Sequence, residues 1–135
     1  MSTQKRKDKT ESGRRKRTKE VYEAVIRAVD YNSGHRQPPL AKQTSVIGAL
    51  HAAGYGRIGL EELHKAITAA LRNGDLFRDT DGEGCTRLGI NDAEKLLEKV
   101  ETNLSRCESP RKDVIGLANR RIQYLRKQVE SEPEL

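Results

Sequence analysis

The chain has 135 residues, of which 34% are hydrophobic and 34% are charged, and its only aromatic residues are four Tyr and one Phe. This composition excludes a large, deep core and favours one small domain with polar extensions. The formal net charge is +6, and residues 1–20, with nine Lys/Arg against three Asp/Glu, carry all of it. A basic segment beside a neutral body favours an anionic partner, such as nucleic acid or acidic lipid.

The sequence offers no sign of a membrane or secreted protein. No apolar run approaches the roughly 20 residues that a membrane-spanning helix needs, and the N-terminus lacks the apolar segment of a secretory signal. The two cysteines, Cys85 and Cys107, do not make a disulfide framework. We therefore expect an intracellular protein with no membrane partner, in the cytoplasm or nucleoid, or in the nucleus if the host is eukaryotic.

Residues 1–18 predict a disordered basic arm, because they contain no large apolar residue except Met1. Flexible cationic arms lie along DNA phosphates or enter a narrow minor groove. Such an arm also matches a nuclear-targeting signal, or a solubilising tail. Its cations form two clusters: Lys5, Arg6 and Lys7, and Arg14, Arg15, Lys16 and Arg17.

Three helices are predicted next, at about residues 19–31, 44–53 and 60–73, from apolar residues at helical spacing. A loop is predicted between the first two, at residues 35–42, because Pro38-Pro39 cannot continue a helix. The run Gly54-Tyr-Gly-Arg-Ile-Gly59 matches a dinucleotide-binding pattern, but a helical segment precedes it where a strand is required, so we interpret these glycines as turn residues. The predicted buried stripe of the third helix is Leu60, Leu63, Ile67, Ala70 and Leu71.

A β-hairpin is predicted after the third helix, with strands at 75–78 and 85–88 and a turn at 79–84. Its turn resembles an EF-hand calcium loop, since Asp79, Asp81 and Glu83 occupy the first, third and fifth positions. Ile90, however, replaces the bidentate Glu that such a loop requires. The histidines and cysteines have no zinc spacing, and no catalytic motif is present. We therefore expect no metal, no cofactor and no enzymatic activity.

Two helices are predicted at the C-terminus, at about residues 93–107 and from Pro110 to 130, before an acidic, frayed tail at 131–135. Apolar residues recur in each at steps of three and four, as in a heptad seam. Either the seams form a dimer, or the two helices pack on the domain or on each other. The fifth helix is also rich in cations that meet nucleic acid or decorate an exposed surface. The expected dimer contacts are Leu97, Val100, Leu104, Ile115, Ile122 and Leu125.

The order of elements over residues 19–90 resembles the winged-helix superfamily, the helix-turn-helix variant with a β-hairpin wing. The segment that carries the resemblance is LEELHKAITAALRNGDLFR, from Leu60 to Arg78, in which an amphipathic helix ends in Asn-Gly and enters a hairpin. The resemblance implies a mostly α fold with a winged helix-turn-helix at 19–90. The two heptad-like seams add the expectation of a C-terminal helical, dimerising element at 91–130. It also implies that the helix at 60–73 reads the major groove of DNA.

Hydrogen-bond donors gather on the exposed face predicted for that helix, opposite its apolar stripe. The acidic turn departs from the basic wing tips that touch DNA, since Asp79, Asp81 and Glu83 repel phosphate. Two arginines at the hairpin base remain able to reach the duplex. Besides the seven arm cations, the predicted DNA contacts are His64, Lys65, Thr68, Arg72, Arg78 and Arg87.

These features together predict a small dimeric transcriptional regulator that binds double-stranded DNA. Two alternatives remain open at this point. One is a nonspecific nucleic-acid or chromatin-associated protein, whose affinity comes mainly from the arm. The other is a helical protein-interaction domain with a calcium-responsive loop at 79–90.

Overall fold

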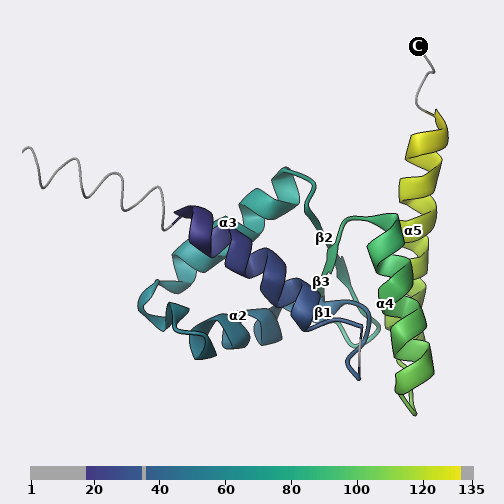
Figure 1. Ribbon diagram of the computed structural model, residues 1–135, viewed down its shortest axis with the longest axis horizontal. Coiled ribbons are helices and arrows are strands. Elements are labelled where there is room, and N and C mark those ends of the chain that lie inside the picture. Colours follow the sequence, from purple (N-terminus) through teal and green to yellow (C-terminus); the bar gives the residue numbers. More distant parts are fainter. Residues whose placement is uncertain (1–17, 35, 132–135) are drawn as a thin grey trace, which may run out of the picture.

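The computed structural model describes residues 18–34 and 36–131, and it is mostly helical with one small antiparallel sheet (Figure 1). The predicted order of three helices, a hairpin and two further helices is confirmed, and Thr18, assigned to the arm, lies in the first helix. Within the described residues, that helix covers 18–31. The other elements are β1 (Ala41–Lys42), α2 (Gln43–Ala52), the 3-10 turn η1 (Tyr55–Arg57), α3 (Leu60–Arg72), β2 (Leu76–Thr80), β3 (Thr86–Ile90), α4 (Ala93–Arg106) and α5 (Lys112–Ser131).

The sheet has the strand order β1-β3-β2, and both pairs are antiparallel. The prediction of an uninterrupted loop at 35–42 was wrong, because Ala41 pairs with Leu88 of β3. A strand of two residues has no alternation to reveal it, and its partner lies 47 positions further along the chain. The hairpin strands also extend beyond their predicted ends, since β2 continues to Thr80, which pairs with Thr86, and β3 continues to Ile90, which pairs with Leu76.

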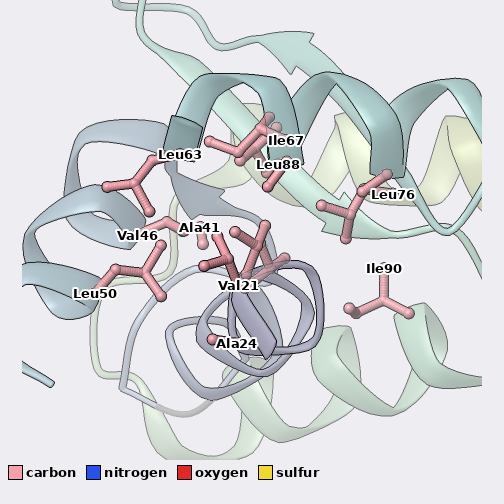
Figure 2. Packing of buried hydrophobic residues seen from close by; sticks show 14 residues of the cluster. Val21, Ala24, Ala41, Val46, Leu50, Leu63, Ile67, Leu76, Leu88 and Ile90 are labelled. Carbon is pink, nitrogen blue, oxygen red and sulfur yellow. The ribbon is translucent and has the colours of Figure 1, made fainter. Parts of the chain in front are cut away.

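The first helix, α2 and α3 cover one face of the sheet. Leu76 and Leu88 point from the strands into a cluster with Val25, Val46 and Ile67, all at most 2% exposed (Figure 2). Most of the predicted α3 stripe is confirmed. Leu60 is the exception, at 54% exposed, because it is the first residue of the helix and lies beyond the buried cluster, to which Ala66 contributes instead.

The α4–α5 hairpin covers the opposite face of the sheet (Figure 1). Phe77 of β2 and Leu40, just before β1, join a second buried cluster with Leu96, Val114 and Leu117. This arrangement follows from strand register, because Phe77 and Leu76 are neighbours whose side chains alternate between faces. The sheet is therefore the middle of three layers, with helices on both sides.

The two C-terminal helices pack on each other within one chain. Of the two interpretations of the seams, packing of these helices on each other and on the domain is therefore confirmed. Val100 and Ile122, which we predicted at a dimer interface, are buried inside the second cluster and are unavailable to a second copy. Because α4 contacts both α5 and the sheet, its buried stripe is shifted to Leu96, Val100 and Asn103. Three other predicted contacts, Leu97, Ile115 and Leu125, are partly buried against the same cluster, and only Leu104 is exposed, at 54%.

Candidate nucleic-acid interface

The outer face of α3 brings together four of the predicted DNA contacts. Gly59 precedes the helix in an extended conformation, and Leu63, Ala66, Ile67 and Ala70 turn toward the core. The face left outside is polar. An open groove of about 420 Å³ runs along it, lined by Glu61, His64, Lys65, Thr68, Ala69 and Arg72.

This face has an excess of donors and only weak internal pairing. Lys65 Nζ lies 3.5 Å from the Glu61 carboxylate, and both side chains are largely exposed. Such a surface pair is worth at most about 1 kcal/mol, so a stronger anion displaces it. Arg72 forms no ion pair with any side chain that the structure describes. The guanidinium, ammonium and hydroxyl groups are therefore free to meet phosphates or base edges.

Side chains from the first helix and from the segment after β3 contact the C-terminal end of α3. The Tyr22 hydroxyl, on the first helix, donates a hydrogen bond to Asp75, and Asn73 Nδ2 donates to the same hydroxyl over 3.2 Å. Burial, followed by the hydrogen bond to Asp75, raises the pKa of Tyr22 above its usual value, so the hydroxyl keeps its proton. Asn91, after β3, donates from Nδ2 to the Gly74 carbonyl over 3.0 Å. The end of the helix that carries the donors is therefore tied to two other parts of the chain.

Strand register separates the two hairpin arginines. Arg78 lies on the same sheet face as Leu76, two residues earlier, and therefore on the α3 side, where it is exposed. Arg87 lies on the other face and is only 3% exposed. The prediction that Arg87 contacts DNA was wrong, because its guanidinium is used inside the fold. Arg78 remains a candidate contact.

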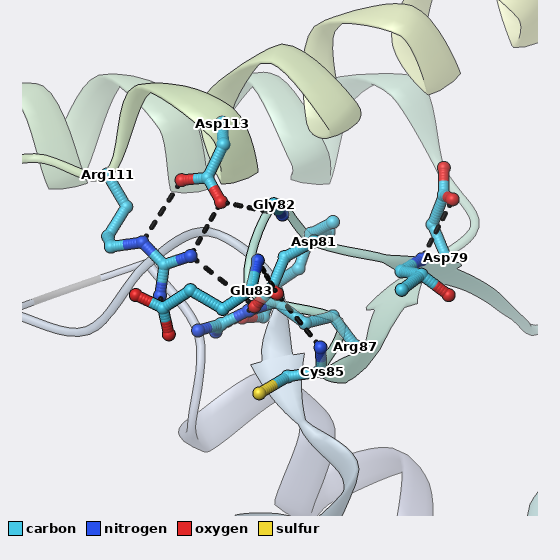
Figure 3. Close-up of polar contacts among 10 residues, drawn as sticks. Asp79, Asp81, Gly82, Glu83, Cys85, Arg87, Arg111 and Asp113 are labelled. Carbon is cyan, nitrogen blue, oxygen red and sulfur yellow. Dashed lines mark hydrogen bonds and ion pairs between the residues drawn. The ribbon is translucent and has the colours of Figure 1, made fainter.

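Arg87 forms an ion pair with the acidic turn that follows β2. Its Nε donates to Asp81 Oδ2 over 2.7 Å, and its Nη1 donates to the Leu40 carbonyl over 2.8 Å (Figure 3). Asp81 Oδ1 accepts from the backbone amides of Glu83 and Cys85, over 2.9 and 3.0 Å. The hydrogen bond from Arg87 is the main reason that the pKa of Asp81 falls from 3.8 to about 2; the two amides also lower it, whereas burial opposes the shift.

The same turn is attached to the start of α5. Asp113 accepts from the Gly82 amide over 2.9 Å and pairs with Arg111 over 2.6 Å (Figure 3). Arg111 also lies 3.5 Å from both Asp81 and Glu83. The bond from Arg111 lowers the pKa of Asp113 as well. The hairpin tip is thus docked on the C-terminal helices.

This docking changes two expectations about the acidic turn. Asp81 does not repel phosphate as we predicted, because it is buried against Arg87, and Glu83 is paired with Arg111. The alternative of a calcium-responsive loop stays a prediction; in this structure Asp81 uses both oxygens on Arg87 and on backbone amides. Ion pairing with Arg87 and Arg111 gives two of the three acids of the EF-hand-like pattern, Asp81 and Glu83, a role within the fold.

The remaining predicted contacts belong to the arm, between Lys5 and Arg17, and lie outside the described residues. Sequence reasoning also missed Arg121, which anchors α5 on the sheet. Its guanidinium lies 5.0 Å from the Phe77 ring centre and 4.6 Å from that of Tyr124, while its Nε donates to Asn91 over 2.8 Å. No local pattern distinguishes this arginine from its exposed neighbours.

Comparison of the chain with the known protein families, with curated proteins and with solved structures finds no match. Within the described residues, no helix is both long enough and apolar enough to cross a membrane. The interpretation of the α3 face therefore depends on its own geometry and chemistry.

Proposed function

We propose that this protein is a winged-helix DNA-binding regulator that reads the major groove with α3. The observation that carries the proposal is the open outer face of α3, where His64, Lys65, Thr68 and Arg72 line one groove. An α-helix fits the major groove, and these side chains are donors suited to bases or phosphates. Arg78 of β2 adds a cation on the same side of the sheet.

The arrangement of elements supports the same proposal. A helix, a short strand, two helices and a hairpin follow one another, and the strand order is β1-β3-β2. In a winged helix the turn between the second and third helices presents the third helix to DNA. Here Gly54, with a φ of 99°, and the 3-10 turn make that connection. The hairpin would serve as the wing, anchored at its tip rather than free.

The basic arm would add affinity that does not depend on sequence. Its phosphate contacts release counterions and make binding strongly dependent on salt. On this proposal the protein acts by occupying DNA, without chemistry, in the cytoplasm or nucleoid, or in a nucleus. The alternative of a nonspecific nucleic-acid-binding protein predicts the same salt dependence, but no preferred sequence.

The proposal includes a homodimer that binds two half-sites. Because the α4–α5 packing uses Val100 and Ile122, the contacts left for a second copy centre on exposed Leu104. Sedimentation of the full chain at micromolar concentration tests this part. A dimer that Leu104→Ala dissociates supports it, whereas a monomer contradicts it and leaves DNA reading by α3 intact.

A selection from random duplex DNA at two salt concentrations tests the reading function. An enriched sequence is expected, and Lys65→Ala and Arg72→Ala should then weaken binding to it. A lost base contact costs about 1–3 kcal/mol and relaxes the preference at one base pair, whereas a lost phosphate contact weakens all sequences alike. Lys95→Ala is the matched control, because Lys95 is an exposed cation on α4. Wild-type binding by both α3 variants would show that α3 is not the reader.

A further inference from the structure

The cations near the C-terminus divide into two groups with different surroundings. Arg111 is committed to Asp113, and Arg121 lies between Phe77 and Tyr124. The other four are exposed and form no ion pair with any described side chain. These four outward cations of α5 are Lys112, Arg120, Arg126 and Lys127.

The outward cations share one face of α5. At 100° per residue they fall, together with Asn119 and Gln123, within an arc of roughly 120°, opposite buried Val114. From Lys112 to Lys127 the face extends about 22 Å at 1.5 Å per residue. No carboxylate lies on it between these residues, since Asp113 turns toward Arg111. Residues 18–135 carry 18 basic and 18 acidic residues, so this face is a local concentration of positive charge in a neutral body.

The chemistry of this face fits the phosphate backbone of nucleic acid. Lys and Arg, together with the amides of Asn119 and Gln123, are the groups that donate to phosphate oxygens. A helix that lies on a membrane needs a large apolar side chain next to its basic residues. Between the cations, this face offers only Gly116, Asn119 and Gln123.

We infer that the outer face of α5 is a second DNA-binding surface, which lets the protein hold two duplexes at once. α3 packs on one face of the sheet and α5 on the other, and the two helices lie on opposite sides of the molecule (Figure 1). A duplex that binds the outer face of α3 therefore leaves the α5 face open to a second duplex. This inference goes beyond the proposed function, because backbone contacts to α5 require no sequence reading by α3.

The test uses the full chain and two duplexes, one tethered to beads and one fluorescent and free. The variant is Arg120→Gln/Lys127→Gln, and the matched control is Arg27→Gln/Lys95→Gln, which removes two exposed cations from the first helix and α4. Wild type and control should capture the fluorescent duplex on the tethered one. The α5 variant should lose this capture, and its log affinity should depend less steeply on log salt, by about 2 units, or 0.9 for each lost phosphate contact.

The outcomes separate this inference from the proposed function. If the α5 variant bridges as well as wild type, or if the control loses bridging equally, the inference is overturned. Acidic-lipid vesicles that bind wild type but not the α5 variant, with DNA capture unchanged, would assign the face to membranes and overturn it too. Lys65→Ala/Arg72→Ala reports separately on α3, because it should abolish sequence preference while the α5-dependent salt slope persists.

Discussion

Asp81 is the residue on which the shape of the hairpin tip depends. It accepts hydrogen bonds from two backbone amides of the turn and forms ion pairs with buried Arg87 and with Arg111, just before α5. A charge buried without its partner is strongly destabilising. Removing this carboxylate therefore affects the turn, the sheet and the docking of α5 together.

Asp81→Asn should lower the unfolding temperature at neutral pH, because Arg87 then stays buried without a counter-charge. The pKa of Asp81 is about 2 in the folded protein against 3.8 for the free group. A depressed pKa contributes stability that is fully present above about pH 4 and is lost as the pH falls toward 2. Thermal melts followed by circular dichroism should show the gap between wild type and variant closing over that range. Exposed Asp79→Asn is the control, and a gap that stays constant down to pH 2 would contradict the prediction.

Gly89 permits the close approach of the sheet and the second cluster. A Cβ atom there would lie 2.5 Å from Phe77 Cε1 and 2.6 Å from Leu40 Cδ2. Gly89→Ala should therefore destabilise the fold by about 1–3 kcal/mol, as overpacking of a filled core does. Gly48→Ala is the matched control at an exposed position of α2, where a Cβ would meet nothing within 4 Å, and it should stabilise by about 0.4–1 kcal/mol. Urea denaturation measures both, and equal effects would contradict the packing.

At the scale of elements, the α4–α5 hairpin attaches to the sheet through its apolar stripe. Leu96 is 1% exposed in the second cluster, whereas Leu104 on the same helix faces outward. Leu96→Ala should reduce the free energy of unfolding by about 2–5 kcal/mol. Leu104→Ala should change it by less than about 0.5 kcal/mol in the monomer. Urea unfolding distinguishes them, and a small effect of Leu96→Ala would show that α4 is not fixed to the sheet.

The sequence predicts the elements of this fold better than their contacts. Helical periodicity located α2 and α3 to within a residue or so, and the first helix ends at Tyr31 as predicted. Periodicity cannot tell a seam that meets a second copy from one that meets the next helix, so Ile122 was assigned to a dimer. Periodicity also cannot detect strand pairing between residues far apart in the sequence, which is why β1 was missed.

For the candidate site too, the sequence predicts what depends on one helix but not what depends on distant residues. The outward face of α3 follows from its buried face, so His64, Lys65, Thr68 and Arg72 were brought together as predicted. The fate of Arg87 depends on Asp81 and on the Leu40 carbonyl, which belongs to a loop 47 residues earlier. Such non-local partners are not visible in a local pattern of charge.

At the scale of the whole molecule, the excess of positive charge lies in residues 1–17 of the sequence. Residues 1–17 carry eight basic and two acidic residues, and the rest of the chain sums to zero. Deleting them should preserve the fold, because they contribute no large apolar side chain except Met1 to a core. If three or four arm cations contact phosphates, the dependence of log affinity on log salt should become shallower by about 3 units. Titrations at several salt concentrations measure this slope, and an unchanged slope would show that the arm does not touch DNA.

Removal of the arm should leave sequence preference unchanged. The preference, on the proposed function, comes from α3, which the deletion does not touch. Repeating the selection from random duplexes with the shortened chain checks this expectation. A lost or altered preference would assign part of the base reading to the arm.

The strand order also leaves β2 at an edge of the sheet, where a strand from another molecule could add. β2 is an edge strand, so one side of its backbone has no partner within the sheet. An unpaired edge is a template on which a strand from another molecule can add, and charged side chains discourage this. β2 carries exposed Arg78 and Asp79 at that edge. A charged side chain at position 78 therefore also opposes fibre growth, and the proposed DNA contact of Arg78 is best probed with Arg78→Gln, because an apolar replacement would invite aggregation that imitates a loss of binding.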